Sequence, residues 1–73
     1  MSLEALRTRL LHMEGVYHSF IVGIMVYAEK KQSRIDAIAH FLDENPDATT
    51  SDVVSFVSDQ PDFYEDAAPV KVG

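Results

Sequence analysis

The sequence predicts an all-α protein, a small helical bundle whose core is completed by a second copy of the chain. Three observations carry this prediction: an apolar repeat of helical spacing over the first 31 residues, capping and stop signals for two further helices, and a chain of only 73 residues without cysteine. A domain of this size buries only about 60% of the surface that its unfolded chain exposes. Disulfides cannot compensate, so we expect oligomerisation to supply further burial.

A long helix is expected over residues 2–31. Eight apolar residues recur there at alternating steps of three and four, the a/d spacing of a helix that packs along a seam. They are Leu3, Leu6, Leu10, Met13, Tyr17, Phe20, Ile24 and Tyr27. Lys30 and Lys31 fall in the last turn, where cations suit the helix dipole. A strand over residues 16–27 is the alternative, but strict alternation of apolar and polar residues fails in its middle.

A second helix is expected over residues 33–44. Its apolar stripe has helical spacing. The stripe consists of Ile35, Ile38, Ala39 and Leu42, with Phe41 at its margin. Asn45 and Pro46 should end this helix, because the residue before a proline avoids the helical region of backbone space.

A third helix is expected over residues 50–60. A capping hydroxyl from Thr49 or Thr50 comes shortly before Asp52, which is close to a capping box. The buried side should consist of Val53, Val54, Phe56 and Val57. Placed end to end, the two shorter helices have about the same length as the long one, given the ordinary helical rise per residue. We therefore expect them to fold back along one side of it.

Residues 1–60 are thus expected to form a single helical domain, followed by an acidic tail over residues 61–73. The tail contains prolines and acidic residues without a helical period, so we expect it to be extended or disordered. Phe63 and Tyr64 are its candidate apolar anchors.

The charge of the chain argues against two classes of partner. Twelve acidic and six basic residues give a net charge of −6, and an acidic surface repels phosphate backbones and anionic lipids. The apolar run over residues 16–28 is also shorter than the ~20 residues that span a membrane. No secretory signal pattern is present, and the lack of cysteine suits the cytoplasm, where we expect the protein to reside.

No enzyme activity, cofactor or metal is expected. The chain has no cysteine nucleophile and no glycine-rich phosphate loop. Two sets of acids and histidines have a spacing of four, which places each set on one helical face. They are Glu14 with His18, and Asp36 with His40 and Glu44. Helical metal sites use a repeated Glu-x-x-His instead, so both sets are predicted to be solvated.

Residues 34–63 resemble the opening of a helix-turn-helix domain, with a helix, an Asn-Pro turn, a threonine cap and a second helix. This resemblance supports an alternative function, either a DNA-associated regulator or an acidic protein that mimics DNA. The helix over residues 50–60 contains no basic residue, however. Direct contact with nucleic acid is therefore not the preferred interpretation.

The preferred function is protein–protein interaction, as a small regulatory or adaptor-like protein that forms a homodimer and also docks on a larger protein. The stretch from Phe20 to Ala28 is apolar all round, and such a helix is buried all round. The predicted interaction face contains Tyr17, Phe20, Ile21, Val22, Ile24, Met25 and Tyr27. A row of small residues beside it, Gly15, Ser19 and Gly23, should let another helix approach closely.

Overall fold

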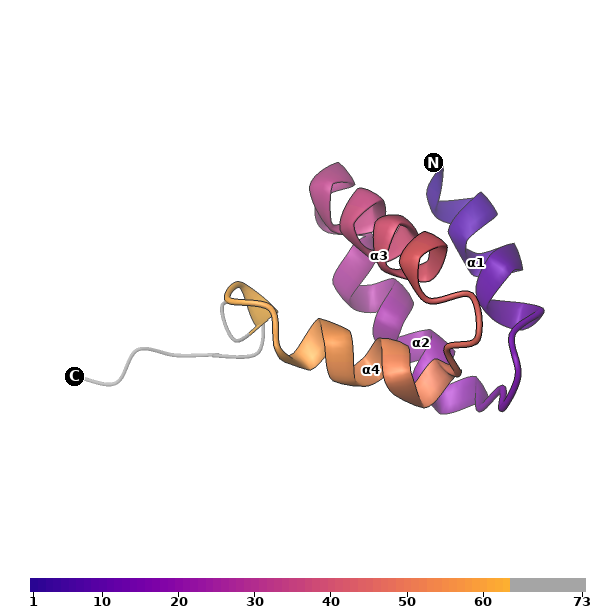
Figure 1. Cartoon of the computed structure of the whole chain (residues 1–73). Coiled ribbons are helices and arrows are strands. Elements are labelled where there is room, and N and C mark those ends of the chain that lie inside the picture. Colours follow the sequence, from indigo (N-terminus) through magenta and orange to yellow (C-terminus); the bar gives the residue numbers. More distant parts are fainter. Residues whose placement is uncertain (64–73) are drawn as a thin grey trace.

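Residues 1–63, which are the part of the chain described by the computed structural model, form four helices. In chain order they are α1 (Leu3–Leu11), α2 (His18–Ala28), α3 (Gln32–Glu44) and α4 (Thr50–Ser58). α2 packs against each of the other three helices (Figure 1). The all-α prediction is therefore confirmed. Within the described residues, no helix combines the length and the apolar character that crossing a membrane requires.

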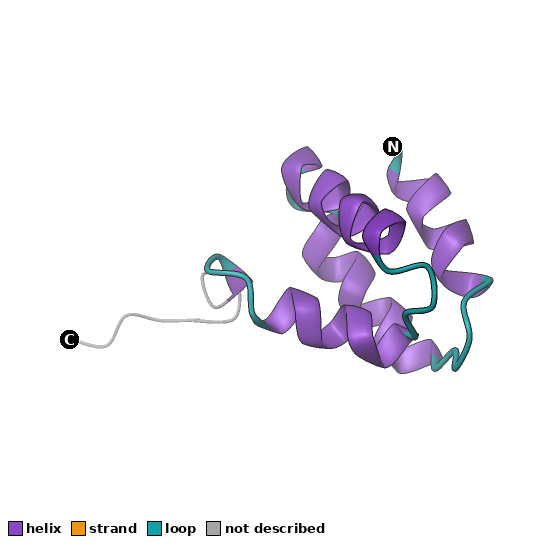
Figure 2. Cartoon of the chain, viewed as in Figure 1, coloured by secondary structure: helices purple, strands orange, loops and turns teal. Residues whose placement is uncertain are grey.

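The prediction of a single long helix over residues 2–31 is wrong. The structure has two helices there, joined by a loop over residues 12–17 (Figure 2). Gly15 lies in this loop with φ 58°, a left-handed backbone conformation that glycine adopts readily and other residues avoid. The chain therefore turns back at Gly15, and α2 returns alongside α1 instead of extending it (Figure 1).

The loop is held in place by the start of α4. Glu14 and Thr49 form an isolated parallel β-bridge, and the hydroxyl of the fully buried Thr50 donates a hydrogen bond to the carbonyl of Gly15. A Cβ placed on Gly15 would lie 3.7 Å from Cβ of Thr49. The turn between α1 and α2 is thus tied to residues 35 positions later in the chain.

The apolar repeat is divided by this turn. Leu6 and Leu10 of α1 are buried, and so are Ile24 and Tyr27 of α2. Tyr17, in the middle of the repeat, is 59% exposed. The spacing therefore identifies the buried side of each helix correctly, but it does not run as one seam through both.

All four helices contribute to one hydrophobic core within a single copy of the chain. Each of its members is at most 6% exposed. They are Leu6, Leu10, Ile21, Ile24, Tyr27, Ala28, Ile35, Ile38, Leu42, Val53 and Val57. Burying a side chain of this kind is worth about 1.5–3 kcal/mol, so these residues account for the packing of the four helices on one another.

The ends of α3 and α4 follow the signals in the sequence. α3 ends at Glu44 with Asn45 as its C-cap, directly before Pro46. Thr49 caps α4 in a complete capping box: its hydroxyl accepts from the Asp52 amide at 3.3 Å, and its own amide donates to the Asp52 carboxylate at 3.0 Å. The helix expected over residues 50–60 is therefore confirmed as an element, although it ends at Ser58.

Replacing each of two glycines with alanine should change stability in opposite directions. Gly15→Ala should lower the free energy of unfolding by about 1–2 kcal/mol, because a Cβ is disfavoured in the left-handed region. Gly23→Ala should raise it by about 0.5–1 kcal/mol, because alanine stabilises a helix interior and its Cβ would meet no atom within 4 Å.

Urea denaturation at successive protein dilutions, which removes any contribution from self-association, measures both effects. In one continuous helix both substitutions would stabilise the protein. A gain in stability from Gly15→Ala would therefore contradict the turn.

Candidate interaction surface

α2 is an uncharged helix with apolar side chains on two sides. It carries no acidic or basic residue between Ser19 and Ala28. One side is buried in the core, whereas Val22 and Val26 on the other side are 51% and 52% exposed. Together with Ser19 and Gly23, which are also exposed, they form one side of the helix, here called the α2 face. A water-facing helix side normally carries polar residues, so the α2 face is a candidate interaction surface.

An apolar groove with a volume of about 370 Å³ lies beside this face, between α2 and α4. It is lined by no charged side chain. Its lining residues are Ser19, Phe20, Gly23, Ile24 and Val26 from α2, and Val54, Val57, Ser58 and Phe63 from α4 and the turn after it. A Cβ on Gly23 would meet nothing within 4 Å, so the backbone of α2 is accessible there. We call this depression the α2–α4 groove.

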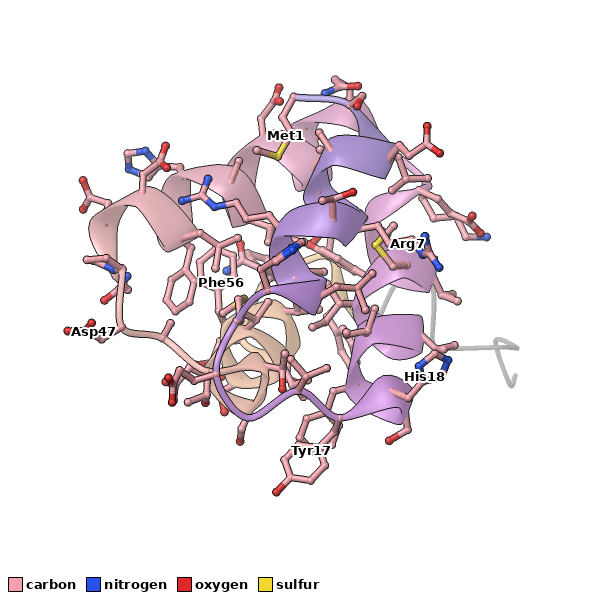
Figure 3. All side chains as sticks on the ribbon, turned by 90° about the vertical axis from the view of Figure 1, so that its right-hand side faces the viewer. Met1, Arg7, Tyr17, His18, Asp47 and Phe56 are labelled. Carbon is pink, nitrogen blue, oxygen red and sulfur yellow. The ribbon has the colours of Figure 1, made fainter. Side chains whose placement is uncertain are left out.

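Tyr17 extends the apolar surface to the beginning of α2. It is the N-cap residue of the helix and projects from the surface of the molecule (Figure 3). Its ring lies 5.1 Å from the ring of Phe20, centroid to centroid, in a tilted arrangement. Phe20 is half-buried and lines the α2–α4 groove, so the two aromatic residues connect the loop to the groove.

The structure separates the predicted interaction residues into two groups. Ile21, Ile24 and Tyr27 are buried in the core of the chain itself, and Met25 is partly buried against that core. Tyr17, Phe20 and Val22 retain exposed surface. A partner can therefore reach the second group, whereas the side chains of the first group pack mainly against α1, α3 and α4.

The prediction that Gly15, Ser19 and Gly23 form a row on one helix face is wrong. Gly15 belongs to the loop before α2 and lies against Thr49. Ser19 and Gly23 remain on the α2 face, where both are exposed. Another backbone can therefore approach closely at Gly23 but not at Gly15.

Several residues of the groove were not singled out from the sequence as interaction residues. Val26 belongs to the apolar run of α2, and Val54, Val57 and Ser58 come from α4. The sequence carried one signal for these residues, which is the width of the apolar stripe on α4. Val53 and Val57 are four residues apart and share one side of the helix, and Val54 widens that side. The pairing of α2 with α4 could not be read from that stripe.

Phe63, one of the two predicted anchors, lies against the helical body. Its ring is 6.2 Å from the ring of Tyr27, and its side chain lines the α2–α4 groove. Tyr64, the other predicted anchor, lies outside the described residues. The chain therefore stays in contact with the helices for at least five residues beyond α4.

The acid and histidine sets do not form a metal centre in the described part of the chain. No group of three or more potential ligand residues comes together there. His40 and Glu44 approach to 3.7 Å on the exposed side of α3. Glu14 lies in the loop before α2, paired with Thr49, so it does not share a helix with His18.

A buried arginine forms a polar cluster at the other end of α2. Arg34 is 2% exposed, and its guanidinium lies 4.3 Å from the centre of the Tyr27 ring. Its Nε donates to the Asp62 carboxylate at 3.0 Å and its Nη1 to the Tyr27 carbonyl at 3.1 Å. The Tyr27 hydroxyl donates to the other Asp62 oxygen at 2.7 Å. We call these three residues the Arg34 cluster.

The Arg34 cluster has a structural explanation. A buried charge is tolerated when it is paired and hydrogen-bonded, and no buried side-chain polar atom in the described region lacks a partner. The hydrogen bond from Tyr27, together with the hydrogen bond and positive charge of Arg34, lowers the pKa of Asp62 below its ordinary value of 3.8. The cluster thus fastens the turn after α4 to α2 and α3.

Comparison of the chain with protein-family models, with curated protein sequences and with solved structures gave no match.

The Arg34 cluster should make stability depend on pH in the acid range. Because the folded pKa of Asp62 lies below 3.8, its stabilising effect is complete above the unfolded pKa and is lost as the pH falls through the folded value. The difference in free energy of unfolding between the parent and Asp62→Asn should be constant near neutral pH and shrink below about pH 3.8. Urea denaturation across this range measures it.

Asp47→Asn is the matched control, since Asp47 is exposed and makes no ion pair within residues 1–63. This substitution removes the same charge at a site without an ion pair, so it separates the loss of the Arg34 and Tyr27 contacts from the loss of charge alone. If the Asp62→Asn difference grew on acidification, the assigned role of the carboxylate would be wrong.

Proposed function

We propose that this is a non-catalytic protein that acts through protein–protein interaction and forms a homodimer through the α2 face and the α2–α4 groove. The observation that carries the proposal is an exposed, uncharged, apolar helix side next to an apolar groove. Contiguous apolar patches exposed on a soluble protein mark interaction sites or ligand grooves. The occupant of this surface is a second copy of the chain.

Self-complementarity supports a second copy. A twofold dimer brings the same patch of both copies together, so the patch must be complementary to itself, as a patch with both a projection and a recess can be. Val22 and Val26 project from α2, and the groove opens beside them at Gly23 and Phe20. A twofold axis near Gly23 would place the projecting valines of each copy in the groove of the other.

Charge supports the same choice. With a net charge of −6, two copies repel each other wherever their acidic surfaces meet. No charged side chain lines the α2–α4 groove, so contact there avoids direct repulsion. A chain of 73 residues also has a small core, and shared burial adds to its stability.

The DNA-associated alternative receives less support from the described residues. If α4 were to enter a major groove, its exposed residues would face the bases and phosphates. They include Ser51, Asp52 and Ser55, followed by Asp59 at the C-cap. Carboxylates in these places repel a phosphate backbone, so the helix-turn-helix likeness of residues 34–63 does not extend to the chemistry of recognition.

Size-exclusion chromatography with light scattering tests the homodimer. The parent should elute with twice the 8.2 kDa mass of one chain. Val22→Glu should weaken self-association by about tenfold or more, because it buries a charge in the proposed apolar contact. Val22 is half exposed, so its replacement should leave the monomer folded, as circular dichroism can verify.

Leu11→Glu is the matched control, because Leu11 is a 41% exposed apolar residue on α1, away from the α2–α4 groove. It should leave the dimer intact. A parent that stays monomeric at high concentration would refute the homodimer, and equal effects of the two substitutions would place the interface elsewhere.

A further inference from the structure

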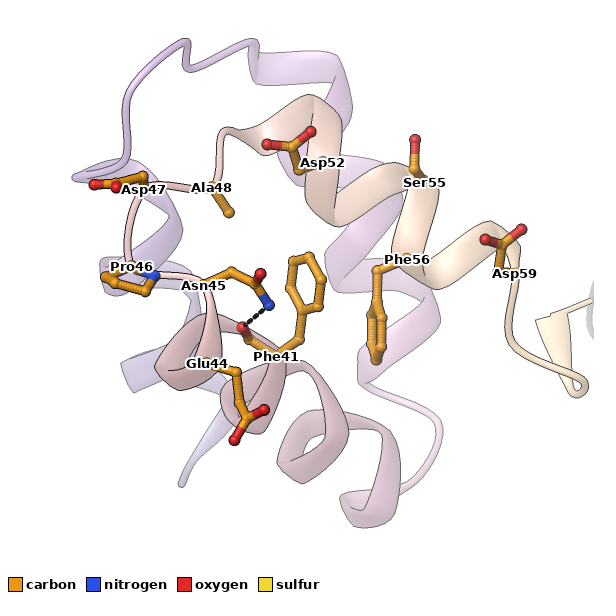
Figure 4. A pocket seen from close by; sticks show the side chains of 10 residues that line it. All are labelled: Phe41, Glu44, Asn45, Pro46, Asp47, Ala48, Asp52, Ser55, Phe56 and Asp59. Atoms are coloured by element: carbon orange, nitrogen blue, oxygen red, sulfur yellow. Dashed lines mark hydrogen bonds between the residues drawn. The ribbon is translucent and has the colours of Figure 1, made fainter.

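A second groove lies between the C-terminal half of α3 and α4, with a volume of about 720 Å³ (Figure 4). Two phenylalanines, Phe41 from α3 and Phe56 from α4, stand side by side in it, and four carboxylates border it. We call it the aromatic groove. The aromatic groove shares no lining residue with the α2–α4 groove, so it is separate from the proposed dimer contact.

The two phenylalanines provide an apolar surface that is partly open. Their rings are stacked with centroids 4.5 Å apart and an interplanar angle of 24°. Both side chains are half-buried, and they pack against the core from its margin. Aromatic faces attract cations, above all the flat guanidinium of arginine, which also stacks on them.

Positively charged side chains compensate little for the carboxylates around these rings, although the Asp52 carboxylate also accepts the Thr49 amide hydrogen bond in the capping box of α4. These carboxylates belong to Glu44, Asp47, Asp52 and Asp59. No lysine or arginine lines the groove. Asp47, Asp52 and Asp59 make no ion pair with any described residue, and Glu44 has only His40 at 3.7 Å. A strongly negative potential should therefore build up over the phenylalanine pair.

Two of these acids occupy places that helix formation disfavours. Glu44 is the last residue of α3, and Asp59 is the C-cap of α4. The C-terminal end of a helix carries partial negative charge, so acids there are destabilising. Folding does not explain either residue, whereas a cationic partner would be attracted by both carboxylates and by both helix ends.

We propose that the aromatic groove binds an arginine side chain in a basic segment of a partner protein. The guanidinium stacks against Phe41 or Phe56, and a carboxylate at the border of the groove accepts its hydrogen bonds. Charge complementarity selects this occupant, because an acidic peptide or a nucleic acid would be repelled by the same four acids. The proposal concerns a surface other than the α2 face, so it stands or falls independently of the homodimer.

A titration followed by ¹H–¹⁵N NMR tests the proposal. The probe is the capped peptide acetyl-Ala-Arg-Ala-Arg-Ala-amide, and its citrulline analogue, which has the same shape without the charge, is the reference. The arginine peptide should shift the amide signals of Ser55, Phe56 and Asp59 in a saturable manner. The citrulline peptide should leave them in place.

Two double variants of equal net charge separate the groove from general electrostatic attraction. Glu44→Gln with Asp59→Asn removes two carboxylates from the groove and should weaken binding about three- to tenfold, as loss of two partly exposed ion pairs would. Glu4→Gln with Glu29→Gln removes two exposed carboxylates elsewhere and should change binding less than about twofold. Phe56→Leu keeps an apolar side chain and should reduce the preference for arginine over a matching lysine peptide.

Three results would overturn the proposal. The first is an absence of saturable shifts at the groove residues. The second is an equal loss of binding in the two double variants, which would mean diffuse attraction to an acidic surface. The third is a duplex DNA probe that binds at the groove residues more tightly than the arginine peptide does.

Discussion

The turn before α2 is the constraint on which the rest of the structure depends. Gly15 adopts a left-handed conformation, and the buried hydroxyl of Thr50 holds its carbonyl. Without this turn, the apolar residues of the first 28 positions would form one long seam. With it, α1 and α2 lie side by side, and the beginning of α4 is fixed against the loop between them. α2 and α3 each contact the other three helices.

The position of α2 explains why the molecule carries two surfaces of different chemistry. α1, α3 and α4 cover one side of α2 and leave the α2 face exposed, so the uncharged apolar residues of this helix exceed what a single copy buries. Four acids border a different surface, where the end of α3 approaches α4 around two phenylalanines. An apolar surface suits a second copy of the chain, and an aromatic surface with acids suits a basic partner. Both surfaces agree with a protein that binds other proteins.

Local signals in the sequence were sufficient for the second half of the fold. The capping box of Thr49 and Asp52, the stop at Asn45-Pro46 and the apolar stripe of α3 each depend on residues within one or two helical turns. The prediction for the first half of the fold was wrong for a physical reason. A spacing of three and four persists through residues 12–17, and one glycine costs only about 1 kcal/mol in a helix, so nothing local requires the break. The Arg34 cluster and the α2–α4 groove could not be predicted from local signals either, because each joins residues that lie far apart in the chain.

The sequence by itself determined the class of the protein: helical, acidic, with an apolar stripe on each helix and a surplus of apolar residues between Phe20 and Ala28. These properties follow from composition and from spacing along a single helix, which are local. Only the tertiary structure decided which of those apolar residues remain accessible, since that depends on the turn at Gly15. The free energy that favours this turn comes from contacts such as the hydrogen bond between Thr50 and the Gly15 carbonyl. That interaction exists only after α4 has packed against the loop.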